Sequence, residues 1–183
     1  MRAPAFWLLT ASFTLYSFAV AALWAHAMPA FAAKGLSETQ ALAVLVWVGP
    51  AQVAGRFAYV WLGRHVSLRG LGLGVLAGMP LSFTLFALFD SSAALIGFAV
   101  LFGIANGMVT IVRGGMVPAY FGRTNVGRIG GTMSGIALLS RAAAPLSTAA
   151  ALLVLAGYRE LMLVLAGLGV LSLGAFALAR PPR

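Results

Sequence analysis

The chain has 183 residues, of which 62% are hydrophobic and only 8% are charged, whereas soluble domains are roughly half apolar and about a quarter charged. This balance excludes an ordinary soluble fold and predicts an all-α integral membrane protein. The net charge of +9 does not predict nucleic-acid binding, because the basic residues stand singly between apolar runs instead of sharing one face.

Apolar runs of the length that a membrane-spanning helix needs, roughly 20 residues, occupy almost the whole chain and form one expected domain over residues 1–183. The first run is longer than the apolar core of a signal peptide, which has about 7 to 15 residues; a signal peptide cleaved after Ala27 is the alternative. The second run opens at Ser37, whose hydroxyl can form a capping box with the side chain of Gln40. The six expected helices cover about residues 4–31, 38–62, 70–89, 92–117, 127–155 and 158–179.

Short polar turns separate the later runs. Asp90 and the two serines after it can cap the fourth helix. Pro118 and residues 121–125 separate the fourth expected helix from the fifth, and residues 157–160 separate the fifth from the sixth. We therefore expect no soluble domain and no long linker.

The positions of lysine and arginine predict the orientation of the helices, since cytoplasmic loops carry an excess of these residues. Only Lys34 and Arg159 fall on one side. We expect both termini on the other, cytoplasmic side. Arginine outnumbers lysine eleven to one, which, with much alanine and glycine, indicates a bacterial protein of the inner (plasma) membrane. The seven basic residues on the cytoplasmic side are Arg2, Arg64, Arg69, Arg123, Arg128, Arg180 and Arg183.

Four of the six expected helices carry polar or small residues at helical spacing, so that these residues share one face. The helices over 70–89 and 158–179 are blander. The four faces are Thr10, Thr14, Ser17 and Trp24; Gln52, Arg56 and Tyr59; Gly103, Asn106, Gly107, Thr110, Arg113 and Gly114; and Gly127, Gly131, Ser134, Arg141 and Pro145.

Two interpretations apply to these faces. Small residues at such spacing usually let membrane helices pack closely, and we interpret the glycines, including the ladder Gly127, Gly131 and Gly135, in this way. For Gln52, Asn106 and the three embedded arginines we favour a functional role, because burying such groups without partners costs several kcal/mol.

Two stretches carry a resemblance to a known family. Residues 28–37 with 49–56, and residues 106–123 with their Asn-Gly, Arg-Gly, Pro and Phe-Gly-Arg elements, resemble the second half of bacterial major facilitator superfamily transporters. The likeness covers nearly the whole chain. The family's cytoplasmic loop signature is only faintly echoed at residues 55–64, where Tyr59 stands in place of the family's Asp.

The resemblance implies a fold and a site. The six helices would be two inverted three-helix repeats with the binding site at the bilayer midplane, where the first two helices of each repeat line the cavity and the third is peripheral. From its depth in the fifth helix we expect Arg141 to bind an anionic substrate group, with Asn106, Gln52 and Trp24 as further substrate-binding residues; the alternative for Arg141 is a salt bridge to an acid in the other half. The residues expected for gating or coupling are Arg56, Arg113 and His26, and the alternative is a coupling residue in the other half.

These features predict half of a secondary active transporter for a small, anionic organic solute, working by alternating access with an N-terminal six-helix half or a second copy of itself. The alternative is a non-transporting, truncated or regulatory membrane protein that associates with such a partner. An enzyme is not expected, because Ser134 has no histidine near it to form a protease site. The chain has no cysteine, and we expect no metal site and no cofactor.

Overall fold

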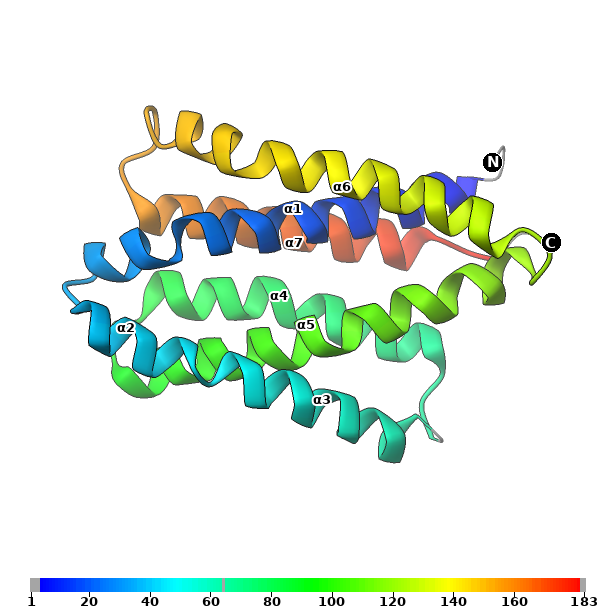
Figure 1. Cartoon of the computed structure of the whole chain (residues 1–183), viewed down its shortest axis with the longest axis horizontal. Helices are drawn as coiled ribbons and strands as arrows, with labels where there is room; N and C mark the ends of the chain where they lie inside the picture. Colours follow the sequence, from blue (N-terminus) through cyan, green and yellow to red (C-terminus); the bar gives the residue numbers. More distant parts are fainter. Residues whose placement is uncertain (1–3, 64, 182–183) are drawn as a thin grey trace.

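The computed structural model describes residues 4–63 and 65–181, and all regular secondary structure in this part of the chain is α-helical (Figure 1). The start of α1 and the end of α7 lie at the same end of an elongated bundle. The helices are α1 (Pro4–Ala33), α2 (Glu38–Leu45), α3 (Val48–Leu62), α4 (Leu68–Leu88), α5 (Ser92–Phe121), α6 (Val126–Ala151) and α7 (Tyr158–Leu178).

Serine side chains cap the start of three helices. The expected capping box is present at α2, where the Ser37 hydroxyl accepts from the Gln40 N–H and the Gln40 side chain accepts from the Ser37 N–H. Ser67 caps α4 and Ser91 caps α5 in the same way, each accepting from the N–H three residues on. These bonds satisfy N–H groups that the first turn of a helix leaves without partners.

The second expected helix is divided into α2 and α3 by a turn at Val46 and Trp47. Pro50 is the third residue of α3. Its nitrogen has no hydrogen to donate to the carbonyl of Val46, four residues earlier, so the helical hydrogen-bond ladder is interrupted at this point.

Two helices end four residues away from their expected bounds. The fourth expected helix continues as α5 to Phe121, through Pro118, and ends at Gly122, whose φ of 73° favours glycine. The fifth ends as α6 at Ala151, not near residue 155. There the N–H groups of Leu153 and Val154 bond to carbonyls three residues back, the tighter pattern that is common at helix ends.

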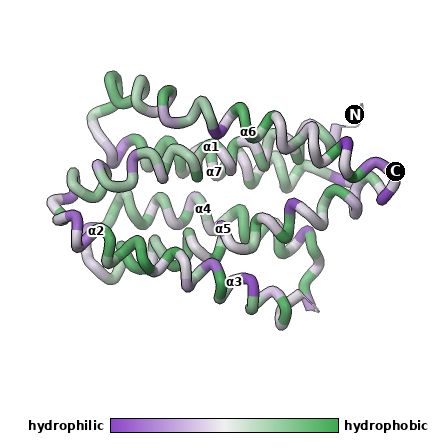
Figure 2. Tube along the Cα trace, viewed as in Figure 1, coloured by the Kyte–Doolittle hydropathy of each residue, from purple (hydrophilic) through white to green (hydrophobic). Residues whose placement is uncertain are grey.

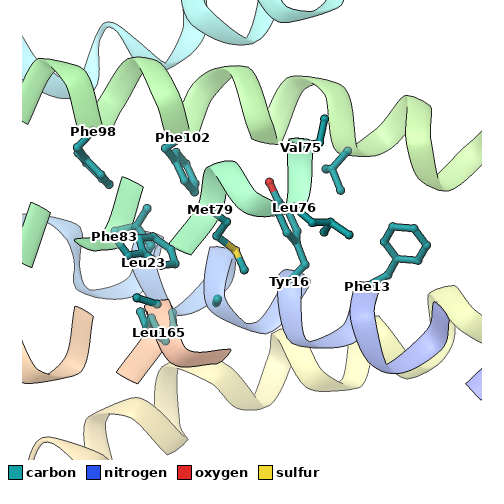
Figure 3. Close-up of a cluster of buried hydrophobic side chains, with 14 of the residues drawn as sticks. Phe13, Tyr16, Leu23, Val75, Leu76, Met79, Phe83, Phe98, Phe102 and Leu165 are labelled. Carbon is teal, nitrogen blue, oxygen red and sulfur yellow. The ribbon is translucent and has the colours of Figure 1, made fainter. Parts of the chain in front are cut away.

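The packing places α4 and α7 side by side. Helix α4 also packs against α5, and α7 also packs against α1, while α3 lies mainly against α5 and α6 mainly against α1. The buried core is rich in aromatic side chains from α1, α4 and α5, joined by residues of α7 (Figure 3). Its largest buried rings include Phe31, Phe83, Phe86, Phe98 and Phe102, several of which meet edge to face.

Glycine lets α3 approach the backbone of α5 closely. A Cβ on Gly107 would lie 2.4 Å from the carbonyl oxygen of Gln52, and one on Gly103 would lie 2.6 Å from that of Val48. These two glycines therefore serve packing, as expected. By contrast, nothing in the described chain lies within 4 Å of a Cβ built on Gly127, Gly131 or Gly135, so no other helix of the described chain packs closely on that ladder.

Five segments are long and apolar enough to cross a membrane, namely α1, α2 together with α3, α4, α5 and α7. This is compatible with a multi-pass membrane protein, and Figure 2 shows most hydrophilic positions towards the two ends of the bundle. Helix α6, with 26 residues, is long enough but is less apolar, because it contains Arg128, Arg141 and many small or hydroxylated residues.

Candidate functional site

A pocket of about 240 Å³ lies between α1, α5 and α6. We call it the central pocket, because its lining residues come from the middle portions of these helices. No residue of α4 or α7 lines it, which agrees with the blander faces of these two helices. No described residue of α3 lines it either, although α3 was expected to face a cavity. Its lining residues are Phe13, Tyr16, Ser17, Val20, Trp24, Asn106, Val109, Thr110, Arg113 and Arg141.

Four of the predicted site residues meet in the central pocket. Trp24 comes from α1, Asn106 and Arg113 from α5, and Arg141 from α6. They are separated by up to 117 positions in the sequence. The packing of α1, α5 and α6 around the pocket brings them together. Arg113 was expected to serve gating or coupling, yet it lies with the residues expected to bind substrate.

The depth of the pocket follows from the position of Arg141. This residue is 15 positions after Val126, the first residue of α6, which at 1.5 Å per residue is about 22 Å along the helix. Since α6 is about 39 Å long by the same rise, Arg141 lies near its middle. The side chain is exposed in the chain as described.

Arg113 reaches across from α5 to α6. Its Nη2 donates a hydrogen bond of 2.8 Å to the hydroxyl of Ser134, which is seven residues before Arg141 and hence on the same face of α6. This bond orients one guanidinium beside the pocket and leaves its other N–H groups free for a ligand.

The carboxylates of the chain lie away from the central pocket. Glu38 and Glu160 are in the first turns of α2 and α7, and Asp90 follows α4. The Lys34 ammonium donates to the Asp90 carboxylate at 2.5 Å. This hydrogen bond and the positive charge of Lys34 lower the pKa of Asp90 from its usual value. In the described residues, therefore, no carboxylate neutralises the arginines of the pocket.

Tyr16 is a pocket residue that the sequence analysis missed. Its side chain is only 3% exposed, and its hydroxyl has no hydrogen-bond partner in the described chain. Figure 3 shows Tyr16 projecting from α1 towards α4 and α5. Its position next to Ser17, on the polar face of α1, is the sequence signal that could have identified it.

The other predicted site residues lie at contacts between two helices, outside the pocket. His26 Nε2 is 2.9 Å from the hydroxyl of Thr148, which joins α1 to α6. Since the Thr148 hydroxyl donates its one hydrogen to the carbonyl of Ala144 at 2.6 Å, Nε2 is the donor to Thr148. His26 therefore fastens two helices, outside the lining of the central pocket.

Arg56 and Gln52 lie at the contact between α3 and α5, which we call the seam between these helices. Arg56 Nε donates to the carbonyl of Gly107 at 3.3 Å, and the backbone of Gln52 lies against the same glycine. Gln52 is thus a packing neighbour of α5 and does not line the central pocket with Asn106 and Arg141.

No protein-family model matches this chain, and a search of the curated proteins finds no match.

Proposed function

We propose that this chain is one six-helix half of a secondary active transporter of the major facilitator type, and that it moves a small anionic organic solute across the bacterial inner membrane by alternating access. The observation that carries the proposal is the central pocket. Arg113 and Arg141 both line it, and Arg141 lies near the middle of α6. Charged residues at such depth are costly and typically mark the path of a substrate or an ion.

The packing pattern supports an arrangement of two inverted repeats. The first repeat is α1, α2 with α3, and α4; the second is α5, α6 and α7. The first helix of each repeat packs against the second and third helices of the other repeat. Thus α1 packs against α6 and α7, and α5 packs against α3 and α4. Helices α1 and α5 run in opposite directions (Figure 1). Inverted repeats with a site between them are typical of secondary transporters.

Helix α6 supplies the sixth crossing in this proposal. Its 26 residues extend about 39 Å, which exceeds the roughly 30 Å of a hydrocarbon core. Its lower apolar content fits a helix beside the pocket, because Arg141 lines the pocket and Ser134 accepts the hydrogen bond from Arg113. With six crossings, both termini lie on one side, and the excess of arginine there places them in the cytoplasm.

The exposed faces of α3 and α6 supply the surface for a partner. The side chains that are at least 71% exposed include Phe57 and Trp61 on α3, Leu139 and Leu146 on α6, and Leu153 in the turn after α6. The open glycine ladder of α6 adds a surface that another helix can approach closely. We propose that an N-terminal six-helix half, or a second copy of this chain, covers these faces, with lipid around the rest.

Arg141→Gln tests the proposed transport function. In membranes that contain the assembled transporter, we expect this variant to lower uptake of the anionic substrate at least tenfold, since a hydrogen bond to a charged group contributes about 1.5–3 kcal/mol. Arg128→Gln is the control, because this exposed arginine in the first turn of the same helix lies outside the pocket. Unchanged uptake of every anionic substrate in Arg141→Gln would refute the substrate-binding role.

The alternative function is a non-transporting membrane protein that binds a partner through the same exposed faces of α3 and α6. Purification of the native complex discriminates between the two. A copurifying six-helix chain together with substrate uptake supports the transporter, whereas a copurifying partner without uptake of any solute supports the regulatory protein.

A further inference from the structure

We infer that the central pocket takes a small dianion, with its two negative charges held between Arg113 and Arg141; this inference rests on the proposed transport of an anionic solute. Dicarboxylates and phosphate monoesters share this chemistry. A single arginine would bind any anion, whereas two arginines favour a solute with two negative charges.

The first argument is that two guanidinium groups from different helices face one small volume. Arg113 comes from α5 and Arg141 from α6, and both line the pocket. The hydrogen bond from Arg113 to Ser134 keeps the first guanidinium on the side of α6 that carries the second. The positive charge of Arg141 acts on Arg113, so the two cations repel each other across the pocket.

The second argument concerns charge balance. The lining residues include no carboxylate, and the three acidic residues of the chain lie at or beyond helix ends, one of them paired with Lys34. A monoanion would leave one of the two guanidinium groups without an opposite charge. A dianion offers each arginine its own charged acceptor, and charge-assisted bonds of this kind are about twice as strong as neutral ones.

The third argument comes from the uncharged part of the lining. Asn106 and Ser17 offer hydrogen-bond donors, and the buried Tyr16 hydroxyl has no partner in the described chain. The remaining lining is apolar or aromatic and suits a short carbon skeleton. The pocket volume of about 240 Å³ suits a small solute.

A charge-matched pair of ligands tests the inference. We would measure binding of succinate and of its monomethyl ester, which has one charge fewer and a similar shape, to the full chain purified with any partner that accompanies it. The expected result is that succinate binds at least tenfold more tightly than the ester, and that Arg113→Gln and Arg141→Gln each reduce this ratio to about one. Arg128→Gln should keep the ratio, and circular dichroism would confirm that each variant is folded.

Glycerol 3-phosphate distinguishes the two sources of a dianion. Tighter binding of this ester than of succinate would assign a phosphate monoester, and its affinity should then fall below about pH 6, where the second phosphate proton returns. Tighter binding of succinate would assign a dicarboxylate.

Two other outcomes would overturn the inference, each in a different way. If succinate and its ester bind equally and both depend on Arg141, the pocket binds an anion through one charge, and the proposed transport of an anionic solute stands without the dianion. If none of the three ligands binds to the wild-type protein, both the dianion and the anionic substrate are wrong.

Discussion

Arg69 lies at the start of α4 and reaches the end of α7. Its guanidinium donates to the carbonyls of Ala177, at 2.5 Å, and Ala179, and to the hydroxyl of Tyr120 at 2.8 Å. The last carbonyls of a helix have no partner within the helix. One arginine thus supplies donors to the end of α7 and joins three helices at one end of the bundle.

Replacing Arg69 should destabilise the fold. We expect Arg69→Ala to lower the free energy of unfolding by about 2 kcal/mol or more, because several hydrogen bonds to a charged group are lost together. The measurement is thermal unfolding in detergent, followed by circular dichroism. Arg123→Ala is the control, since Arg123 is exposed in the turn after α5. Equal melting temperatures for the two variants would contradict the structural role of Arg69.

His26 is the histidine of the membrane-spanning segments and hence our candidate for proton coupling. It hydrogen-bonds Thr148 and so joins α1 to α6. We expect that His26→Gln, which can keep a donor to Thr148, leaves the fold intact but lowers proton-driven uptake by the assembled transporter. His65→Gln, in the loop before α4, should keep this uptake. Unchanged proton-driven uptake in His26→Gln would exclude coupling through this residue.

At the scale of the helices, the seam between α3 and α5 depends on the absence of a side chain at Gly107. A methyl group there would lie 2.4 Å from the Gln52 carbonyl oxygen, which is backbone and cannot rotate away. The two helices would have to separate, and overpacking of this kind typically costs 1–3 kcal/mol.

Gly107→Ala should therefore lower the unfolding free energy by roughly 2 kcal/mol. Gly114→Ala on the same helix is the matched control, because nothing lies within 4 Å of its added Cβ. It should be neutral or stabilising by up to about 1 kcal/mol, since alanine favours helix more than glycine does. Melting curves of the two variants in one detergent provide the comparison. A Gly107→Ala protein as stable as Gly114→Ala would show that the seam can open without cost.

At the scale of the molecule, the proposed orientation places the turn between α5 and α6 in the cytoplasm and the turn between α4 and α5 outside. The chain has no cysteine, so a single introduced thiol has no background. We expect Asn125→Cys to react with a membrane-impermeant maleimide only from the cytoplasmic side, and Ser92→Cys only from outside. Both residues are exposed. Reaction of both from the same side would show that α5, the helix between them, does not cross the membrane.

The sequence by itself determined the helices of this protein. Long apolar runs, and the serines at positions 37, 67 and 91, act within one or two turns of the chain, and the structure confirms an all-helical chain with apolar helices of membrane-spanning length. The exceptions are also local. Both exceptions occur at a proline, whose nitrogen has no hydrogen to donate to the carbonyl four residues earlier. The helix is broken before Pro50, whereas α5 continues through Pro118.

Only the tertiary structure decided which polar faces meet. Helical spacing gave equal weight to the faces of α1, α3, α5 and α6, but α3 turns Arg56 and Gln52 towards α5, whereas α1, α5 and α6 enclose the central pocket. The same packing moved Arg113 to the side of Arg141. Such choices depend on contacts between helices far apart in the sequence, which are set by the fit of side chains and of glycine gaps across the whole bundle.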